Sequence, residues 1–472
     1  MDASSLKSRL LNDGGLGDAE AAPLQIHLCG IAGVGVAGLA RLLLARGHRV
    51  SGSDLAQNAL TDWLQEGGVT VYHGHDANYL ADAADLLIRS AAVPDRNPEV
   101  TKARAFGIPV AQRGEILPIL LDQPCSVAVS GTHGKTTTSA MIAHVMQQAD
   151  QSPGYFIGGE SPQFDGAAGP GDGRFFVAEC DESDGTIRHY HPRFGVVTNI
   201  EFDHMETFGS EDAFLACFET FAEQCEQLIL CGDDPQAARL ARSNSILYGF
   251  DSGFPISASD VRQEGRCMRF TLHLHGKSVD ACLTSTPGVH HVLNALAASA
   301  VCHEAGCDLD QIVAGLESFQ SVGRRFETVV NQAGIQIIED YAHHPTEVAA
   351  LIRSTQGMDP QRIFMIYQPH RYSRTLALKD DFPASFVGLD QLMLVPVYAA
   401  SEAPLEGGRS VDLLASAQQQ GVSALYAESL VEAWGRIYPL LRAGDVLLIA
   451  GAGDVNQISV WARDTFAASA DL

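Results

Sequence analysis

The chain has 472 residues, which is more than one hydrophobic core usually organises, so we expect two or three domains. Its 46% hydrophobic and 19% charged residues are typical of a packed globular protein. The formal net charge is -26 and no run of lysine and arginine occurs, which excludes nucleic acid and anionic membrane surfaces from the expected partners.

The ten cysteines form no CxxC pair, and several lie in apolar runs, which indicates reduced and buried thiols. Residues 1–22 are a polar leader without the apolar block of a secretory signal. No apolar stretch approaches the roughly 20 residues that span a bilayer. We therefore expect a soluble, cytoplasmic protein without membrane insertion, either a monomer or a weak homodimer.

Residues 23–122 alternate short apolar runs with helical patterns, which predicts a parallel sheet with crossover helices. The expected strands are 26–30, 48–54 and 85–93. Near the start, Gly33, Gly35 and Gly38 form a GxGxxG pattern that follows the first strand and opens a helix. Asp54 lies about 20 residues further along the sequence, where a Rossmann unit has an acidic residue that contacts a ribose. The pattern predicts a site for the diphosphate of a nucleotide, and it does not identify the nucleotide, which could be NAD or another. The alternative is that the glycines serve only the packing of the helix.

Residues 123–324 begin with an apolar run at 125–130, a glycine loop and a helical pattern. In this loop Gly131 and Gly134 let the backbone turn around an anion, Lys135 neutralises β- and γ-phosphate charge, and Thr136 offers a hydroxyl to Mg²⁺. Ala128 stands where the general P-loop pattern has its first glycine, so the loop is a shorter variant. A glycine turn that only caps a buried helix is the alternative interpretation.

Further along, we expect a long loop at 158–173, strands at 175–180 and 194–200, and a small antiparallel excursion at 250–283. Acidic residues and a histidine follow the two strands, in the segments 179–184 and 199–204. Carboxyl ends of parallel strands are where ligands bind, so these segments predict magnesium sites beside the glycine loop. A solvated charged surface is the alternative.

Residues 325–472 contain four apolar runs separated by helical patterns, which predicts a third α/β domain; the runs are 335–341, 362–371, 391–398 and 445–453. Paired arginines at Arg324 and Arg325, and again at Arg371 and Arg374, suit a bidentate grip on phosphate or carboxylate. The adjacent pair at 343–344 favours substrate contact over zinc, since no third ligand is spaced for it.

Taken together, the ordered motifs SGSD, NPE, GTHGKTTT, DESDG, NIEFDH, GRRF, DYAHHPTE, QPHRYSRT and GAGD resemble those of the Mur ligases from about Ile26 to Gly453. The resemblance implies an α/β fold of three domains: Rossmann-like at the N-terminus, P-loop ATPase-like in the centre and Rossmann-like at the C-terminus. It also implies ATP-dependent joining of L-alanine to UDP-N-acetylmuramic acid through an acyl phosphate, with Mg²⁺ as cofactor, two ions expected and Mn²⁺ a possible substitute.

Carried over by position, the resemblance assigns functional residues to each domain. Catalytic residues are Lys135, Glu179, His204 and Arg325, and metal ligands are Thr136, Glu179 and His204. ATP contacts are Gly131, Thr132, His133, Gly134, Lys135, Thr136, Thr137, Asn294, Arg325 and Asp340. UDP-sugar contacts are Gly33, Gly35, Gly38, Ser53, Asp54, His75, Ser90 and Asn97, and amino-acid contacts are Tyr341, His343, Arg371 and Arg374.

The chain departs from the family pattern at His291, where an asparagine is usual, at Glu339 in place of aspartate, and at Cys180 in place of alanine. Three alternatives remain open. They are a ligase that attaches a preformed tripeptide to the same UDP-sugar, a nucleotide-binding regulator without activity, and an NAD dehydrogenase. The glycine loop at 30–38 favours alanine over the tripeptide, and the second, ATP-type loop argues against a dehydrogenase.

Overall fold

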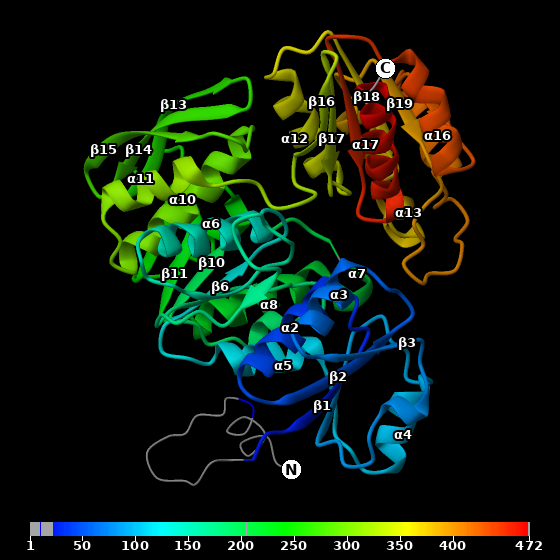
Figure 1. The fold of residues 1–472 in the computed structure, drawn as a ribbon. Helices are drawn as coiled ribbons and strands as arrows, with labels where there is room; N and C mark the ends of the chain where they lie inside the picture. Colours follow the sequence, from blue (N-terminus) through cyan, green and yellow to red (C-terminus); the bar gives the residue numbers. More distant parts are fainter. Residues whose placement is uncertain (1–9, 11–21, 204, 471–472) are drawn as a thin grey trace. The chain divides into compact units, whose positions relative to one another are not determined.

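The computed structural model describes residues 10, 22–203 and 205–470, so the predicted polar leader lies almost wholly outside it. The chain forms two compact units (Figure 1). One comprises the described residues up to 259 together with 271–281 and 293–319. The other comprises 260–270, 282–292 and the described residues from 320 onwards.

The first sheet is fully parallel, with strand order β3-β2-β1-β4-β5. Its strands are β1 Gln25–Cys29, β2 Arg49–Asp54, β3 Thr70–His73, β4 Leu86–Arg89 and β5 Val110–Gln112. The helices are α2 Val34–Ala45, α3 Ala59–Glu66, α4 Pro98–Ala105 and α5 Arg113–Leu121, with the 3₁₀ turn η1 Ala77–Tyr79. The order reverses between β1 and β4, and ligands of open α/β sheets bind at the carboxyl ends of strands at such a point.

The central sheet has the order β15-β14-β13-β12-β11-β10-β6-β9-β7-β8. Its strands are β6 Ser126–Ser130, β7 Gly154–Phe156, β8 Ala168–Gly169, β9 Phe176–Glu179, β10 Phe194–Val197, β11 Gln227–Cys231, β12 Ser245–Gly249, β13 Ile256–Glu264, β14 Cys267–Leu274 and β15 Lys277–Leu283. The helices are α6 Lys135–Gln148, α7 Met205–Phe208, α8 Glu211–Gln224, α9 Pro235–Ala238, α10 Val289–Glu304 and α11 Leu309–Ser318, with η2 Thr186–His189. Since β6 runs parallel between β10 and β9, the loop after β6 lies among the segments that leave those two strands.

The third sheet has the order β16-β17-β21-β18-β19-β20, and only β16 pairs antiparallel. Its strands are β16 Glu327–Gln332, β17 Ile335–Asp340, β18 Arg362–Tyr367, β19 Gln391–Leu394, β20 Ala424–Tyr426 and β21 Asp445–Ala450. The helices are α12 Pro345–Gln356, α13 Tyr372–Leu378, α14 Phe382–Ser385, α15 Ser410–Gln419, α16 Leu430–Ile437 and α17 Gln457–Ala470, with η3 Tyr438–Leu440 and η4 Asp454–Asn456.

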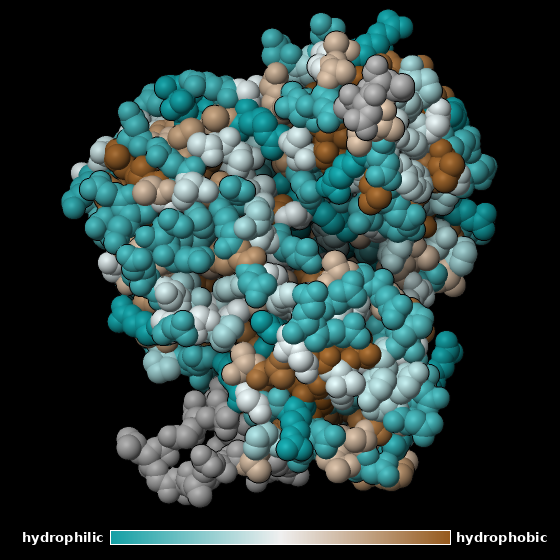
Figure 2. Space-filling model, in the orientation of Figure 1, coloured by the Kyte–Doolittle hydropathy of each residue, from teal (hydrophilic) through white to brown (hydrophobic). Residues whose placement is uncertain are grey.

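Buried apolar side chains lie on both faces of the first and third sheets. In the first unit one continuous core joins Leu28 and Leu39 of the first sheet region to Phe156 and Phe218 of the central region. On the face shown in Figure 2 hydrophilic residues predominate, and hydrophobic residues lie in small groups. Among the described residues, no helix is long and apolar enough to cross a lipid bilayer.

The predicted three-domain α/β fold is confirmed, with a parallel sheet in the first region and a mostly parallel sheet in the third. The strands predicted from long apolar runs are present, although most end one to four residues earlier than the runs do. One expectation is wrong: the segment 158–173 is not a single loop, because residues 168–169 form β8, which pairs with β7.

Candidate functional site

The glycine loop after β6 is held by the segment that follows β10. The backbone N–H of Thr132 donates to the carbonyl oxygen of Asn199 (3.0 Å), and that of His133 donates to Asn199 Oδ1 (2.8 Å). The hydroxyl of Thr198 donates to the carbonyl of His133 (2.6 Å). The residues that follow β10, Thr198 and Asn199, therefore fix the shape of the loop. Helix α6 begins directly after the loop, at Lys135.

Both glycines of this loop adopt backbone conformations that favour glycine, with φ of 129° at Gly131 and 81° at Gly134. A Cβ atom at Gly134 would lie 2.7 Å from Oδ1 of Asn294 on α10. The structure therefore brings Asn294 to the loop, where it was predicted to contact the nucleotide. Thr136 and Thr137, in the first turn of α6, are largely buried, with exposed fractions of 6% and 4%.

The ammonium group of Lys135 has three acceptors in the structure. Its Nζ donates to the carbonyl oxygens of Gly131 (2.6 Å) and Thr132 (3.0 Å) and to Oε2 of Glu182 (2.6 Å). The side chain of Glu182 is 1% exposed. Sequence reasoning placed Glu182 in an acidic segment but missed its pairing with Lys135.

Electrostatics around Lys135 favour its charged form. Burial lowers the pKa of Lys135, but the charges of Glu182, Asp181 and Glu179 outweigh burial, so the pKa is raised. Burial raises the pKa of Glu182 to about 7, and Lys135 opposes this shift. Burial also works against ionisation of Asp181, yet Lys135 and Arg113 lower the pKa of its carboxyl below the ordinary value.

Glu179 ends β9, and its Oε2 accepts a hydrogen bond from the backbone N–H of Gly158 (2.8 Å). Carboxylate oxygens and the hydroxyl of Thr136 are hard donors of the kind that Mg²⁺ prefers, so the donor set near the loop fits this ion. His204, predicted as a ligand of a second ion, lies outside the described residues.

In the first domain, the glycines of the GxGxxG pattern have different environments. Gly33 is the N-cap of α2 and is exposed. A Cβ atom at Gly35 would lie 2.6 Å from Nη1 of Arg113, and one at Gly38 would lie 3.0 Å from the ring of Phe156. Gly38 is buried, so it serves the close packing of α2, which was the alternative interpretation of the pattern.

Asp54, expected to contact a ribose, uses both carboxylate oxygens within the protein. Oδ2 accepts from the backbone N–H of Ala32 (2.9 Å), and Oδ1 accepts from that of Ala56 (2.9 Å). Asp54 thus fixes the backbone just before the exposed Gly33. Arg113, at the start of α5, was missed: its guanidinium lies against Gly35 and 3.8 Å from a carboxylate oxygen of Asp181.

Two of the other predicted UDP-sugar contacts, Ser53 and Asn97, are buried, whereas His75 and Ser90 are half-buried. Ser53 is fully buried and donates to Oε2 of Glu99 (2.8 Å), and Nδ1 of His75 is 3.1 Å from the same oxygen. Asn97 is 5% exposed, and its Oδ1 caps α4. Ser90 is half-buried. Ser53 and Asn97 thus make hydrogen bonds within the first domain, and their contact with the UDP-sugar stays a prediction.

In the second unit, two arginines that precede β16 lie against the ring of Tyr341, which directly follows β17. The guanidinium carbons of Arg324 and Arg325 lie 5.0 and 4.9 Å from the centre of its ring. Arg324 also donates to Oε1 of Glu339 (2.7 Å), so the glutamate at this position keeps a carboxylate partner for the arginine. Burial raises the pKa of Asp340 to about 6, and Arg325 opposes the shift.

His343 lies beside Glu347, with Nδ1 3.4 Å from Oε2, and its ring meets that of His370 edge to face at 5.8 Å. Burial lowers the pKa of His343 to about 4, Glu347 opposes the shift and Arg374 adds to it. Arg374 on α13 is 8% exposed, and its Nη1 lies 3.3 Å from Nδ1 of His370.

Arg371 precedes α13 with φ of 67°, and its Nε lies 3.1 Å from Oε1 of Glu402. Glu402 was missed in the sequence, where it stands in a loop without a motif. Its carboxylate also accepts from the hydroxyl of Ser373 (2.6 Å). Arg371 is thus held by a carboxylate of its own unit, while Arg374 lies in the buried histidine-rich environment.

Three family models match the chain in order. Residues 25–123 match the model described as Mur ligase family, catalytic domain, residues 129–302 match the Mur ligase middle domain, and residues 324–453 match the Mur ligase, glutamate ligase domain. The models thus cover the glycine pattern of the first sheet, the loop around Lys135 and the arginine and histidine segments of the second unit.

Solved structures with similar folds include a UDP-N-acetylmuramate-alanine ligase from Thermotoga maritima. It is 28% identical, with 94% of this chain and 100% of that chain covered and a TM-score of 0.83. A ligase for UDP-N-acetylmuramate and L-alanyl-γ-D-glutamyl-meso-diaminopimelate from Neisseria meningitides is 27% identical over 64% of this chain and 100% of that chain, with a TM-score of 0.58. A murein peptide ligase from Psychrobacter arcticus, 23% identical over 94% and 98% with a TM-score of 0.70, shares the fold.

Proposed function

Since the chain belongs to the Mur ligase family, we propose that it joins the carboxylate of UDP-N-acetylmuramic acid to the amino group of L-alanine with consumption of ATP, in peptidoglycan synthesis. The observation that carries this proposal is the similarity to the Thermotoga maritima ligase, which extends over all of that chain. The site around Lys135 supports the ATP-dependent part.

The proposed reaction has two steps. A carboxylate oxygen of the UDP-sugar attacks the γ-phosphorus of ATP, the bond to the β-phosphate oxygen breaks, and ADP leaves. The amine of L-alanine then attacks the acyl carbon, the bond to the phosphate oxygen breaks, and the amine loses a proton. Phosphate therefore leaves with one oxygen of the original carboxylate.

Nucleotide binding falls to the loop 131–134 and the first turn of α6 in this proposal. The backbone N–H groups at the start of α6 and the charge of Lys135 would offset phosphate charge, which is the main electrostatic obstacle when a carboxylate attacks a polyphosphate. Thr136 and Glu179 would hold a magnesium ion, which when bound neutralises part of the phosphate charge. We retain Asn294, Arg325 and Asp340 as nucleotide contacts.

Recognition of the other substrates is proposed for the first and third domains. Gly33 and Gly35 would admit the diphosphate of the UDP-sugar, and Arg113 would add a guanidinium beside Gly35, since arginine suits planar contacts with phosphate. The carboxylate of L-alanine would be bound by Arg371 and Arg374, with Tyr341 and His343 beside them. The division of these roles follows the predicted domains 23–122, 123–324 and 325–472.

A second candidate is attachment of a tripeptide to the same UDP-sugar. The similarity to the Neisseria meningitides ligase favours it, because that likeness is nearly as strong by identity, although it covers less of this chain. Both candidates share the acyl-phosphate step and differ only in the nucleophile.

Oxygen-18 in the carboxylate of UDP-N-acetylmuramic acid tests the shared step. We expect the label to appear in the released phosphate, detected by mass spectrometry, in an amount equal to the amide formed. Phosphate without label would contradict the acyl phosphate, since no carboxylate oxygen would then have reached the phosphorus.

A further inference from the structure

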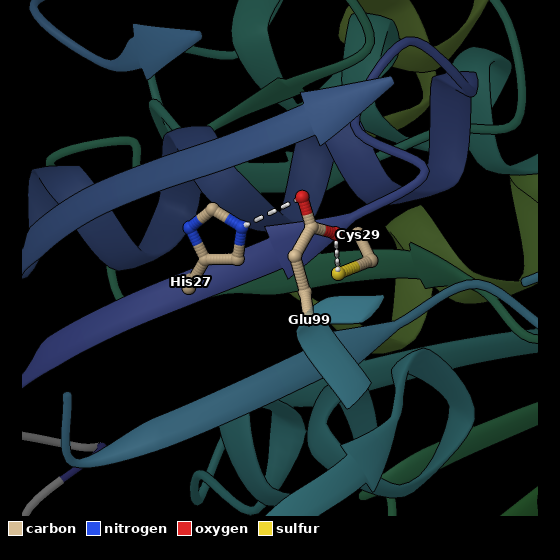
Figure 3. Close-up of side chains that lie close together, drawn as sticks. All are labelled: His27, Cys29 and Glu99. Atoms are coloured by element: carbon tan, nitrogen blue, oxygen red, sulfur yellow. Dashed lines mark hydrogen bonds and ion pairs between the residues drawn. The ribbon is translucent and has the colours of Figure 1, made fainter. Parts of the chain in front are cut away.

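Three ligand-type side chains meet inside the first sheet region, away from the proposed nucleotide site. His27 and Cys29 are two residues apart on β1, so they point to the same face of the sheet, and Glu99 lies in the first turn of α4. Their exposed fractions are 1%, 0% and 0%. Figure 3 shows the three side chains converging, with Glu99 between the other two.

One polar atom in this cluster has no hydrogen-bond partner among the described residues. Nδ1 of His27 lies 2.9 Å from the hydroxyl of Ser51, but its Nε2 makes no hydrogen bond. That Nε2 points toward Oε1 of Glu99 across 4.0 Å, which is too long for a hydrogen bond. A buried nitrogen that faces a carboxylate across such a gap is unusual, because buried polar groups are nearly always paired.

The thiol of Cys29 contacts the same carboxylate that the imidazole of His27 faces. Oε2 of Glu99 accepts from this thiol at 2.8 Å.

We propose that His27, Cys29 and Glu99 bind a zinc ion. Their ligand atoms lie within 4.8 Å of one another, and zinc binds cysteine sulfur, histidine nitrogen and carboxylate oxygen. A thiolate and a carboxylate balance the two positive charges of the ion. On binding, a bond forms between zinc and Sγ of Cys29, and the thiol proton leaves to solvent.

The neighbourhood of the cluster supports a tetrahedral site. Ligand atoms around tetrahedral zinc lie about 3.3–3.8 Å apart, which falls between the 2.8 Å from Sγ of Cys29 to Oε2 of Glu99 and the 4.8 Å limit of the group. Zinc also binds through three protein ligands with water in the fourth position, and His75, whose Nδ1 is 3.1 Å from Oε2 of Glu99, lies outside the group of three. Ser51 orients His27 from behind, as outer partners of metal-bound histidines do. Thiolate and imidazole ligands disfavour Mg²⁺, so this site is chemically different from the one at Glu179.

Cobalt(II) in place of zinc tests the proposal by absorption spectroscopy. The full chain is produced in minimal medium with added cobalt, so that the ion is present while the buried site forms. We expect a thiolate-to-cobalt charge-transfer band and the visible bands of tetrahedral cobalt in the purified protein. We expect Cys29→Ser to lose the charge-transfer band, and His27→Gln to keep that band but change the visible bands.

Two variants serve as matched controls. Cys217→Ser removes another buried thiol of the same unit, and His275→Ala disrupts the exposed group of His275, His303 and Glu304, which also has ligand-type side chains. Both should keep the full spectrum. The proposal is overturned if the wild-type protein shows no charge-transfer band, if the band survives in folded Cys29→Ser, or if His275→Ala abolishes it. Circular dichroism establishes whether each variant is folded. If Cys29→Ser does not fold, His27→Gln decides the question, because unchanged visible bands in that variant overturn the proposal.

Discussion

The ammonium of Lys135 and the carboxylate of Glu182 form a buried ion pair, with Nζ 2.6 Å from Oε2. The pair joins the first residue of α6 to the segment after β9, and two carbonyl oxygens of the glycine loop complete the acceptors of Lys135. Phosphate oxygens that approach this loop would compete with Glu182 for the same ammonium group. The pair therefore couples the conformation of the acidic segment to nucleotide binding in the proposed reaction.

Replacement of Lys135 by alanine tests the role of its charge in phosphoryl transfer. We expect turnover to fall by about 10²–10³, because one strong charge-stabilising contact is typically worth that much. Binding of UDP-N-acetylmuramic acid should be unchanged, since it is proposed for the first domain. Phosphate release and titration calorimetry measure the two quantities, and a variant with more than about a tenth of wild-type activity would contradict this role.

The ion pair also predicts a pH dependence of stability. Burial raises the pKa of Glu182 in the folded protein to about 7. The contribution of Glu182 to the free energy of unfolding is therefore largest at a pH below its pKa in the unfolded chain, and it is lost as the pH rises through 7. In Lys135→Met the opposing charge is gone, which raises the pKa of Glu182 further. We expect the melting temperature of this variant to lie further below that of the wild type at pH 8 than at pH 6.

Glu182→Gln in the Lys135→Met background is the control for that dependence. An amide of nearly the same shape cannot ionise, so the double variant should lose the extra instability at pH 8. Melting curves recorded by circular dichroism at several pH values provide the comparison. An equal loss at both pH values in Lys135→Met would mean that Glu182 is not the titrating group.

The arginines of the third domain predict selective effects on the amino acid. Lysine in place of Arg371 or Arg374 keeps the charge but removes the bidentate geometry. We expect KM for L-alanine to rise far more than KM for ATP in both variants. Glu402→Gln, which leaves Arg371 without its carboxylate partner, should have a smaller effect of the same kind. Steady-state kinetics with each substrate varied in turn measures this, and equal changes in both KM values would indicate a structural or phosphate-binding role.

The positions of the lysines predict that metal binding in the central domain does not involve a carbamylated lysine. The five lysines are 7, 102, 135, 277 and 379, so the stretch 136–276 contains none and no carbamylated lysine can form there. Activity should therefore be independent of bicarbonate in buffers depleted of carbon dioxide. If His204 holds a second ion, its imidazole must be neutral, so the Mg²⁺ requirement should rise as pH falls towards about 6.5. We expect a much smaller rise in His204→Ala, and bicarbonate-dependent recovery of activity would contradict the interpretation.

Local sequence patterns predicted those strands, loops and helices that directly follow one another in the chain. The apolar run, glycines and helical pattern at 125–148 identified β6, the loop and α6, because the signals are adjacent in sequence. Short strands such as β3, β5 and β20 were not predicted, since three or four residues give no clear periodicity.

Contacts between distant segments could not be predicted in the same way. Glu182 is 47 residues from Lys135, and only the placement of β9 beside β6 makes them partners. Glu402 pairs with Arg371 from a loop that carries no motif. The glycine pattern could not separate Gly38, which packs against Phe156, from the exposed Gly33, because both fit the same template.

The most direct test of the proposed function is phosphate release by the purified protein with UDP-N-acetylmuramic acid and ATP, and with L-alanine, glycine, L-serine or the tripeptide L-alanyl-γ-D-glutamyl-meso-diaminopimelate as the nucleophile. Mass spectrometry of the UDP-sugar product identifies the amide that forms. We expect the highest kcat/KM with L-alanine and a product that carries a single alanine. A higher kcat/KM with the tripeptide, or phosphate release with none of the four, would contradict the proposal.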